Sequence, residues 1–372
     1  MENMGQHVFS FYERQSHMAL DSLQHSVTPA KRRFDILDIV RGISLLGVLL
    51  ANMPGHSYLG YLTSAEQNSL PLASFNEPLK FIAMFLLDGK FYSLFSLLFG
   101  LGFSLIVSKA GRSHIMIRRL LVLVCFGFLH ALLLWGGDIL LLYALLGFSL
   151  PLFNRLKDKT ILMFAIFLLV SPIILDSARM VTDGSFSPEK PFFEKNEDLV
   201  INEHGITPLT DSNLAKWMKN GDVTDLLAYN YTEIYYRWGY LLNSNRLPKV
   251  LGLFLIGLLI GRRKMFINLP EHVPELRQVR NWGFLVGIPT SLMYAYTELY
   301  TEGTSLAVHS AWYVFSVFPM AFAYGASICL LYLNGSFSKL FNNFQYVGKM
   351  ALTVYLMQSF IGVSWFRTWI SC

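Results

Sequence analysis

One histidine lies beside a sharp turn that carries a carboxylate. His130 is near the end of an apolar run that finishes at Trp135, and a Gly-Gly pair and Asp138 follow at once. Two antiparallel helices joined by so short a turn place His130 and Tyr143 at comparable depths, with Asp138 roughly 10 Å from them by the helical rise per residue. An imidazole that titrates near neutral pH can act as a general base. We expect His130 to be such a base, oriented by Asp138; the simpler alternative is a buried neutral histidine bonded to a neighbouring helix.

Two pairs of opposite charge lie within apolar runs, where an unpaired charge is costly. Asp38 and Arg41 are three residues apart on one helix face, so they can neutralise each other. The alternative is that Arg41, with Asp38 beside it, faces an inner cavity and grips a phosphate of a donor. Asp88 and Lys90 form the second pair, toward the outer end of the next run. They fit an interfacial anchor, or a site in which Asp88 contacts substrate and Lys90 stabilises an oxyanion.

Other polar side chains in or beside the apolar runs are candidates for contact with a substrate. Besides Asp88, we expect five of them to line such a site: His56, Trp135, Tyr143, Tyr355 and Gln358. His56 is also a rival to His130 for the chemistry. Hydrogen bonding between helices explains the stripe formed by Tyr355, Gln358 and Ser359 equally well. Glu233 and Arg237 are four residues apart and are most simply a surface pair.

The composition is that of a membrane protein. Of 372 residues, 53% are hydrophobic and only 15% are charged, and the mean hydropathy is +0.42, whereas soluble domains carry about 25% charged residues. The net charge of +5 does not indicate nucleic acid, because the basic residues form short clusters between apolar runs, as in cytoplasmic loops. The sequence lacks Walker A, HExxH and CxxC motifs, so it predicts neither nucleotide hydrolysis nor a metal site. Residues 1–30 are polar and lack the core of a cleavable signal peptide.

The apolar runs predict an all-helical transmembrane bundle of about nine spans, with the amino terminus in the cytoplasm. The runs are 35–53, 81–107, 119–136, 138–154, 160–176, 248–261, 281–298, 309–333 and 350–366. Basic clusters such as those at 31–33 and 262–264 all fall on one side of this arrangement, which sets the orientation. The predicted regions are a cytoplasmic tail at 1–33, helices one to five at 34–176, an extracytoplasmic segment with short surface helices at 177–247, and helices six to nine at 248–372.

Two local features refine these spans. The triplet Asp88-Gly89-Lys90 interrupts the second run, so an interfacial helix followed by a shorter span is expected there. Gly100 and Gly102 indicate close packing of helices, because small residues let membrane helices approach each other.

Four sequence blocks resemble the YeiB-like bacterial membrane proteins, a family of unknown function. They are DILDIVRGISLLGVLLAN at 35–52, GKFYSLFSLLFGLG at 89–102, the run 118–143 with WGGDIL at 135–140, and GKMALTVYLMQS at 348–359. The blocks occur in order and span most of the chain. Members of that family usually continue through one or two further spans, whereas this chain stops at Cys372, so it is expected to be naturally short or truncated.

The Arg-Gly start of the first helix is also similar to that of transmembrane acyltransferases of the heparan-glucosaminide acetyltransferase and acyltransferase-three types. That resemblance implies transfer of an acyl group from a cytosolic donor to an acceptor across the membrane. It also implies a catalytic histidine near the outer side, which would be His130 or His56.

The combined expectation is a multi-pass acyltransferase-like enzyme in the bacterial plasma membrane. It would use acyl-CoA as donor, without a tightly bound cofactor, and a glycan or lipid of the cell envelope as acceptor. A secondary transporter or exporter is the main alternative, since buried charges and broken helices also form transport pathways. A non-catalytic envelope or sensor protein, with 177–247 binding a partner, is the third.

Overall fold

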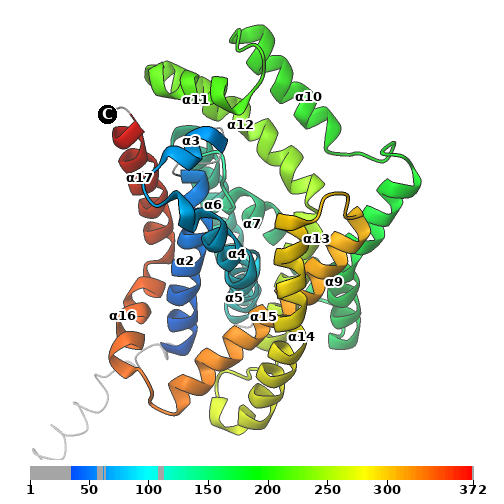
Figure 1. Cartoon of the computed structure of the whole chain (residues 1–372). Helices are drawn as coiled ribbons and strands as arrows, with labels where there is room; N and C mark the ends of the chain where they lie inside the picture. Colours follow the sequence, from blue (N-terminus) through cyan, green and yellow to red (C-terminus); the bar gives the residue numbers. More distant parts are fainter. Residues whose placement is uncertain (1–34, 57–61, 63, 108–112, 371–372) are drawn as a thin grey trace, which may run out of the picture. The chain divides into compact units, whose positions relative to one another are not determined.

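The apolar runs of the sequence form helices that lie against one another (Figure 1). The computed structural model describes residues 35–56, 62, 64–107 and 113–370, and every regular element in these ranges is helical. The predicted tail at 1–33 lies outside the described residues. Helical structure is what a chain of this hydropathy requires, because a helix satisfies its own backbone hydrogen bonds away from water.

Five stretches of the described chain are long and apolar enough to cross a membrane. They are α2 (Asp35–His56), the pair α4 (Asn76–Leu86) and α5 (Lys90–Val107), α6 (Ser113–Leu133), α9 (Asp158–Val181) and α15 (Leu306–Leu333). A sixth is obtained if α12 (Val223–Asn243) and α13 (Arg246–Arg262), which are bent by 68° at their junction, count as one span. The chain is therefore a multi-pass membrane protein by the length and composition of its helices.

The prediction of about nine spans is not confirmed. The run at 138–154 divides into α7 (Leu140–Gly147) and α8 (Leu150–Phe153), and α17 (Ala351–Ile370) contains a shorter apolar stretch. The run at 281–298 lies in α14 (Val273–Tyr300), which has 28 residues but mixes polar side chains into its apolar sequence. By hydropathy these three segments are predicted to be spans. In the structure two of them are too short and the apolar sequence of α14 is interrupted by polar side chains, so none of the three is long and apolar enough to count as a span. Their orientation in a membrane stays a prediction.

Short elements fill the connections. They are α3 (Ser64–Ser69), η2 (Ala73–Phe75), α10 (Lys190–Asp198), η3 (Leu199–Glu203), α11 (Asp211–Asn220), η4 (Leu269–His272) and α16 (Ser338–Lys349). The short helices expected within 177–247 are present as α10 and α11. In Figure 1 these two helices, with α12, lie at the same end of the structure as the last turn of α17.

The second run shows the expected break at Asp88-Gly89-Lys90 and, at one of the two glycines of α5, the expected close packing. The run breaks between Leu86 and Lys90, with Gly89 at φ +74°, a conformation that favours glycine. Gly100 packs as expected: a Cβ there would lie 2.0 Å from the carbonyl oxygen of Phe254 on α13. Gly102 does not pack against a helix, since a Cβ there would meet nothing within 4 Å; it faces a cavity instead.

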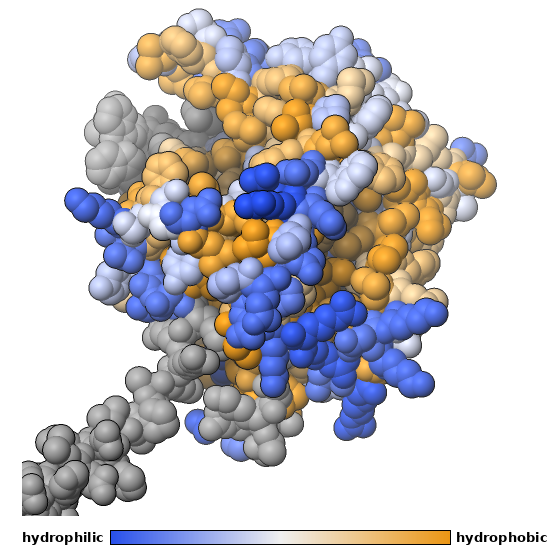
Figure 2. Space-filling view, turned by 90° about the horizontal axis from the view of Figure 1, so that it is seen from below, coloured by the Kyte–Doolittle hydropathy of each residue, from blue (hydrophilic) through white to orange (hydrophobic). Residues whose placement is uncertain are grey.

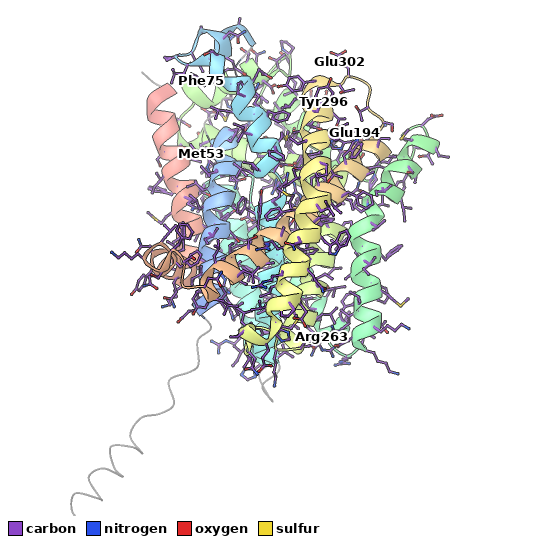
Figure 3. The ribbon with its side chains drawn as sticks, turned by 60° about the horizontal axis from the view of Figure 1, so that its bottom comes forward. Met53, Phe75, Glu194, Arg263, Tyr296 and Glu302 are labelled. Carbon is purple, nitrogen blue, oxygen red and sulfur yellow. The ribbon has the colours of Figure 1, made fainter. Side chains whose placement is uncertain are left out.

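Arg263 and Glu302 lie at opposite ends of the helices (Figure 3). In Figure 3, Arg263 lies at one end and Glu302 and Phe75 lie toward the opposite end. Seen from below, the structure presents hydrophilic residues gathered among hydrophobic ones (Figure 2). The sequence predicts orientation from such a charge asymmetry, and that orientation stays a prediction.

Candidate functional site

His130 and Asp138 are in direct contact. Nδ1 of His130 lies 3.0 Å from Oδ1 of Asp138, within ion-pair distance although outside hydrogen-bond geometry. Both side chains are buried, at 0% and 3% exposure. The expected separation of roughly 10 Å is wrong, because α6 ends at Leu133 and α7 begins only at Leu140. Asp138 thus lies in the turn, where its side chain can reach back to His130.

The turn holds the Asp138 carboxylate in place. Its other oxygen, Oδ2, accepts a hydrogen bond from the backbone N–H of Leu141 at 2.7 Å. This bond caps the start of α7, where backbone N–H groups lack helical partners. One oxygen is therefore fixed by α7 and the other is directed to the imidazole of His130, which is how a carboxylate orients a catalytic histidine.

A second histidine is buried nearby. His56, in the last turn of α2, is 2% exposed, and its ring packs edge-on against Trp135 with 4.3 Å between ring centroids. Neither ring nitrogen of His56, nor either one of His130, has a hydrogen-bond partner among the described residues. Buried polar atoms without partners are costly, and they are concentrated where a protein receives a ligand. The pair His56 and His130 is therefore the strongest candidate for the reacting groups.

Tyr355 of α17 joins the histidine pair to a large cavity. Its ring centroid is 5.1 Å from that of His130, and the same side chain lines the cavity. One turn further along α17, the Gln358 side chain donates to the backbone carbonyl of Leu45 on α2 at 3.5 Å. Gln358 therefore connects α17 to α2, as hydrogen bonding between helices predicts. Tyr355 lines the cavity, whereas His130 does not.

The cavity is amphipathic. Its volume is about 790 Å³, within the range of small-molecule sites. Its basic lining consists of Arg41, Arg118, Arg119 and Lys349. The rest of its wall is mainly aliphatic and aromatic, supplied by α2, α5, α6, α7 and α17, and includes Tyr92, Tyr143 and Tyr355. A cavity with this lining suits a ligand that has an anionic part and an apolar part.

Arg41 forms the ion pair that its spacing predicts and also lines the cavity. Its Nη1 lies 2.7 Å from Oδ1 of Asp38, and the arginine side chain remains 27% exposed. Asp38 is buried at 8% side-chain exposure. Arg41 and His56 lie on the same helix, 15 residues apart and so roughly 22 Å along its axis. α2 therefore connects the basic part of the cavity with the histidine pair.

Tyr143 lies at the wall of the cavity rather than beside His130. Its hydroxyl is 2.5 Å from Oγ of Ser96 and donates to the carbonyl of Tyr92 at 3.1 Å. The residue is buried at 1% exposure and belongs to the largest hydrophobic cluster. Tyr143 thus fixes α7 against α5.

The structure does not bring Lys90 and Asp88 into contact with the histidine pair. The Lys90 ammonium donates to the carbonyl of Met84 at 2.7 Å, and Asp88 accepts from the hydroxyl of Tyr294 at 2.9 Å. No ion pair joins Asp88 to Lys90 within the part of the chain that the structure describes. These two residues belong to a separate polar cluster against α14, so Lys90 is not positioned to stabilise an oxyanion beside His130.

Arg237 is a site residue that its spacing in the sequence does not reveal. The interpretation of Glu233 and Arg237 as a surface pair is wrong, because Nε of Arg237 donates to the carbonyl of Asp138 at 3.1 Å. In addition, Asn230 donates to the carbonyl of Leu132 on α6 at 3.0 Å. α12 therefore packs over the turn that carries Asp138. An arginine at 99 residues from its partner gives no local sequence signal.

The apolar helices and the buried histidine pair define a multi-pass membrane protein with an internal polar site. The family described as "Protein of unknown function (DUF418)" matches residues 260–371. The uncharacterized protein YxaH of Bacillus subtilis is 27% identical over 354 residues, which cover 92% of this chain and 83% of that protein. The uncharacterized protein YeiB of Escherichia coli is 37% identical over 123 residues, 30% of this chain and 28% of that protein.

A shorter match is to an uncharacterized 39.9 kDa protein of Bacillus acidopullulyticus, 34% identical over 132 residues, 34% of this chain and 36% of that protein. No solved structure matches the chain significantly. The matches to YxaH, YeiB and DUF418 confirm the resemblance to the YeiB-like family of unknown function.

Proposed function

We propose that the chain is an acyltransferase-like enzyme of the bacterial plasma membrane, which passes an acyl group from a cytosolic donor to a glycan or lipid of the cell envelope. The observation that carries this proposal is the position of His130. Its buried imidazole has a carboxylate at 3.0 Å, and its ring centroid lies 5.1 Å from that of Tyr355, which lines the amphipathic cavity.

The cavity supports an acyl-CoA donor. Guanidinium groups bind phosphate oxygens through charge-assisted hydrogen bonds, and Arg41, Arg118 and Arg119 all line this cavity. The apolar wall beyond them suits an acyl chain or a pantetheine arm. In this arrangement the thioester would extend from Arg41 toward Tyr355. The donor is a substrate that arrives and leaves, so no tightly bound cofactor is proposed.

The proposed reaction is a transfer of the acyl group from sulfur to oxygen. Nε2 of His130, the nitrogen that does not face Asp138, takes the proton of an acceptor hydroxyl as the hydroxyl oxygen attacks the thioester carbonyl. The carbon–sulfur bond then breaks, and the imidazolium returns its proton to the thiolate. The products are an ester and a free thiol. Asp138 stabilises the transient imidazolium, and His56 is positioned to bind the acceptor or to replace His130 in this role.

A secondary transporter is the second candidate. Two breaks favour it: the interruption at Gly89 and the 68° bend between α12 and α13, because transporters build central sites from discontinuous helices. A transporter would move its substrate without changing it chemically. The two candidates are therefore separated by the product.

The test uses the full chain reconstituted in lipid vesicles with octanoyl-CoA as donor. Candidate acceptors are an N-acetylglucosamine oligomer and diacylglycerol, and the products are identified by mass spectrometry alongside flux measurements. We expect an octanoyl ester to form, and His130→Ala to slow its formation roughly 10²–10⁴-fold, the usual contribution of acid–base catalysis. His114→Ala, at an exposed position on the same helix, is the matched control and should keep the parent rate.

Three further outcomes decide the donor, the role of His130 and the class of protein. Arg41→Ala should weaken octanoyl-CoA binding, and Arg41→Lys should restore it only in part, because lysine lacks the planar fork that pairs two oxygens. Full activity of His130→Gln would assign His130 a structural role. If a substrate accumulates in the vesicles chemically unchanged, the proposed function is transport and not acyl transfer.

A further inference from the structure

A second polar cluster lies at the junction of α12 and α13, outside the histidine pair. Lys90, Arg246 and Lys249 each lie over the ring of a tyrosine. Arg246 is 4.1 Å from the ring centroid of Tyr92, and Lys249 is 3.6 Å from that of Tyr313. The hydroxyls of these two tyrosines are 2.8 Å apart. The two cations are therefore held over one hydrogen-bonded pair of rings.

The third cation extends the same arrangement. The Lys90 ammonium lies 5.6 Å from the ring centroid of Tyr294, and that ring packs edge-on against Tyr313 with 5.5 Å between centroids. Lys90 is completely buried, and Lys249 is 5% exposed. Cation–π contacts compensate only part of the cost of removing an ammonium group from water.

The nearby carboxylates do not neutralise this cluster. Among the described residues, no carboxylate oxygen lies within the 4.0 Å ion-pair distance of Lys90, Arg246 or Lys249. Asp88 is bonded to the Tyr294 hydroxyl instead. Asp176 is held by Arg179 at 2.6 Å, by the side-chain amide of Asn245 at 2.8 Å and by the hydroxyl of Ser310. Of these two carboxylates, Asp176 is paired with an arginine and Asp88 is hydrogen-bonded to a tyrosine, so neither one forms an ion pair with the three cations.

Most of the donor groups of these cations also have no acceptor among the described residues. The only hydrogen bond of Arg246 to a described residue is a long one, 3.5 Å, to the hydroxyl of Tyr240. Lys249 has none, and Lys90 uses one of its three donors for the carbonyl of Met84. Lys249 is therefore a polar side chain more than nine-tenths buried whose ammonium has no hydrogen-bonded partner in the part of the chain that the structure describes.

The backbone adds to the positive field at the same place. α13 begins at Arg246, directly after Asn245 in the left-handed conformation at φ 49°. Its first N–H groups and the helix dipole favour an anion at this end. Arg246 and Lys249 are three residues apart in the first turn, so they lie on the same face of α13.

From these observations we propose that Arg246 and Lys249 form a binding site for a phosphate group, with Lys90 adding positive charge to the surroundings, distinct from the phosphate contact assigned to Arg41. A phosphate supplies the missing counter-charge, and its several oxygens can accept from a guanidinium and an ammonium group at once. The Arg246 guanidinium lies over the ring of Tyr92, and Tyr92 also lines the amphipathic cavity. The proposed phosphate site therefore adjoins that cavity. The proposal does not depend on whether the chain is an enzyme or a transporter.

The phosphate can belong to a lipid headgroup or to a soluble compound, and two probes separate these sources. The full chain in a neutral detergent is titrated with inorganic phosphate or with dihexanoyl phosphatidylglycerol, at constant ionic strength set by sodium chloride. Thermal unfolding is followed by tryptophan fluorescence, because a ligand that binds the folded state raises the midpoint. Stabilisation by both probes identifies a site open to soluble phosphates. Stabilisation by the lipid alone identifies a headgroup site.

Variants test which residues bind the phosphate. Lys249→Met and Arg246→Gln should each raise the half-maximal phosphate concentration about tenfold or more, the loss expected for a hydrogen bond to a charged group. Lys249→Arg should retain binding. Arg277→Gln, at an exposed position on α14, should match the parent.

The stability without phosphate separates binding from a structural role. Methionine can keep the contact with the Tyr313 ring without the charge, so Lys249→Met should unfold at the parent midpoint or above it when phosphate is absent. The proposal is overturned if neither probe stabilises the parent, or if Lys249→Met and Arg246→Gln both keep the parent response. A lowered midpoint in Lys249→Met, restored by Lys249→Arg without any response to phosphate, would make Lys249 a packing residue only.

Discussion

Charged side chains in this protein have partners from distant parts of the chain as well as from their own helix. Arg179 shows this most clearly. It contacts Asp176 at 2.6 Å and Glu189 at 3.2 Å, and it donates to the backbone carbonyls of Leu242 and Asn243. The spacing of Asp176 and Arg179 predicts only the first contact. The others depend on the turn after α9 and on the end of α12.

We expect a large loss of stability when the Asp176 carboxylate is removed from this buried cluster. Asp176→Ala leaves Arg179 buried with a single carboxylate partner, so the free energy of unfolding should fall by about 3 kcal/mol, the lower end of the range for broken buried pairs. Glu77→Gln removes an exposed partner of Lys80 and should cost no more than about 1 kcal/mol. Detergent-denaturant titration of both variants measures the difference. Equal losses would show that the Asp176 cluster contributes no more than a surface pair.

The start of α12 carries a pH-dependent cap that lies outside the apolar helices. The Asp222 side chain accepts from the hydroxyl and backbone N–H of Thr224 and from the backbone N–H of Asp225. These bonds, first of all the one from the Thr224 hydroxyl, hold the pKa of Asp222 below its ordinary value of 3.8. The cap is therefore fully formed above that ordinary pKa and is lost as the pH falls through the lowered pKa of the folded state.

Because the pKa of Asp222 is lowered in the folded state, the first turn of α12 should open locally in acid. Amide hydrogen exchange at residues 223–225, corrected for the pH dependence of the intrinsic rate, should accelerate below the ordinary pKa of Asp222. Asp222→Asn keeps an acceptor oxygen but does not titrate, so its corrected exchange should not change with pH. An acid response that persists in Asp222→Asn would assign the opening to another group.

At the scale of elements, the sequence predicts the existence of helices better than their contacts. Apolar runs locate α2, α5, α9 and α15, since any chain that buries so many apolar residues must satisfy its backbone locally. The contact of Arg237 with the turn at Asp138 could not be predicted in the same way. It depends on the 68° bend between α12 and α13, which sets the path of α12 over α6 and has no periodic pattern in the sequence.

The glycines of α5 provide a matched pair for testing how this helix packs. Gly100 lies against the backbone of Phe254, which cannot move aside, whereas Gly102 faces the cavity. Gly100→Ala should therefore lower stability by about 1–3 kcal/mol, the usual cost of overpacking, and Gly102→Ala should leave it within about 0.5 kcal/mol. Thermal unfolding of both variants in the same detergent is the measurement. The interpretation fails if Gly102→Ala is the more damaging change.

At the scale of the whole molecule, the candidate site depends on elements from both halves of the sequence. α2 supplies Arg41 and His56, the turn after α6 supplies Asp138, and α17 supplies Tyr355. The family match at 260–371 covers only the last of these, whereas the alignment with YxaH covers 92% of the chain. The resemblance therefore extends over the segments that form the site, and not only over the carboxyl-terminal helices.

The charge asymmetry of the helix ends predicts how the molecule is inserted. Arg263 follows α13 in a basic cluster, and Glu302 follows α14, the next long helix, which ends on the opposite side (Figure 3). Because basic loops are retained in the cytoplasm, Glu302 should face the outside and Arg263 the inside. The experiment places one cysteine at each position in a chain whose own Cys125, Cys329 and Cys372 are replaced by serine or alanine.

An impermeant maleimide applied to intact cells should label Glu302→Cys at once and Arg263→Cys only after the membrane is permeabilised. If Arg263→Cys is labelled in intact cells and Glu302→Cys is protected, the true topology is the inverse of the predicted one. The basic part of the cavity, at Arg41, would then open to the outside, where no cytosolic acyl donor is present. This measurement consequently tests the orientation and the proposed source of the donor together, because both require the amino-terminal end of α2 to lie on the cytoplasmic side.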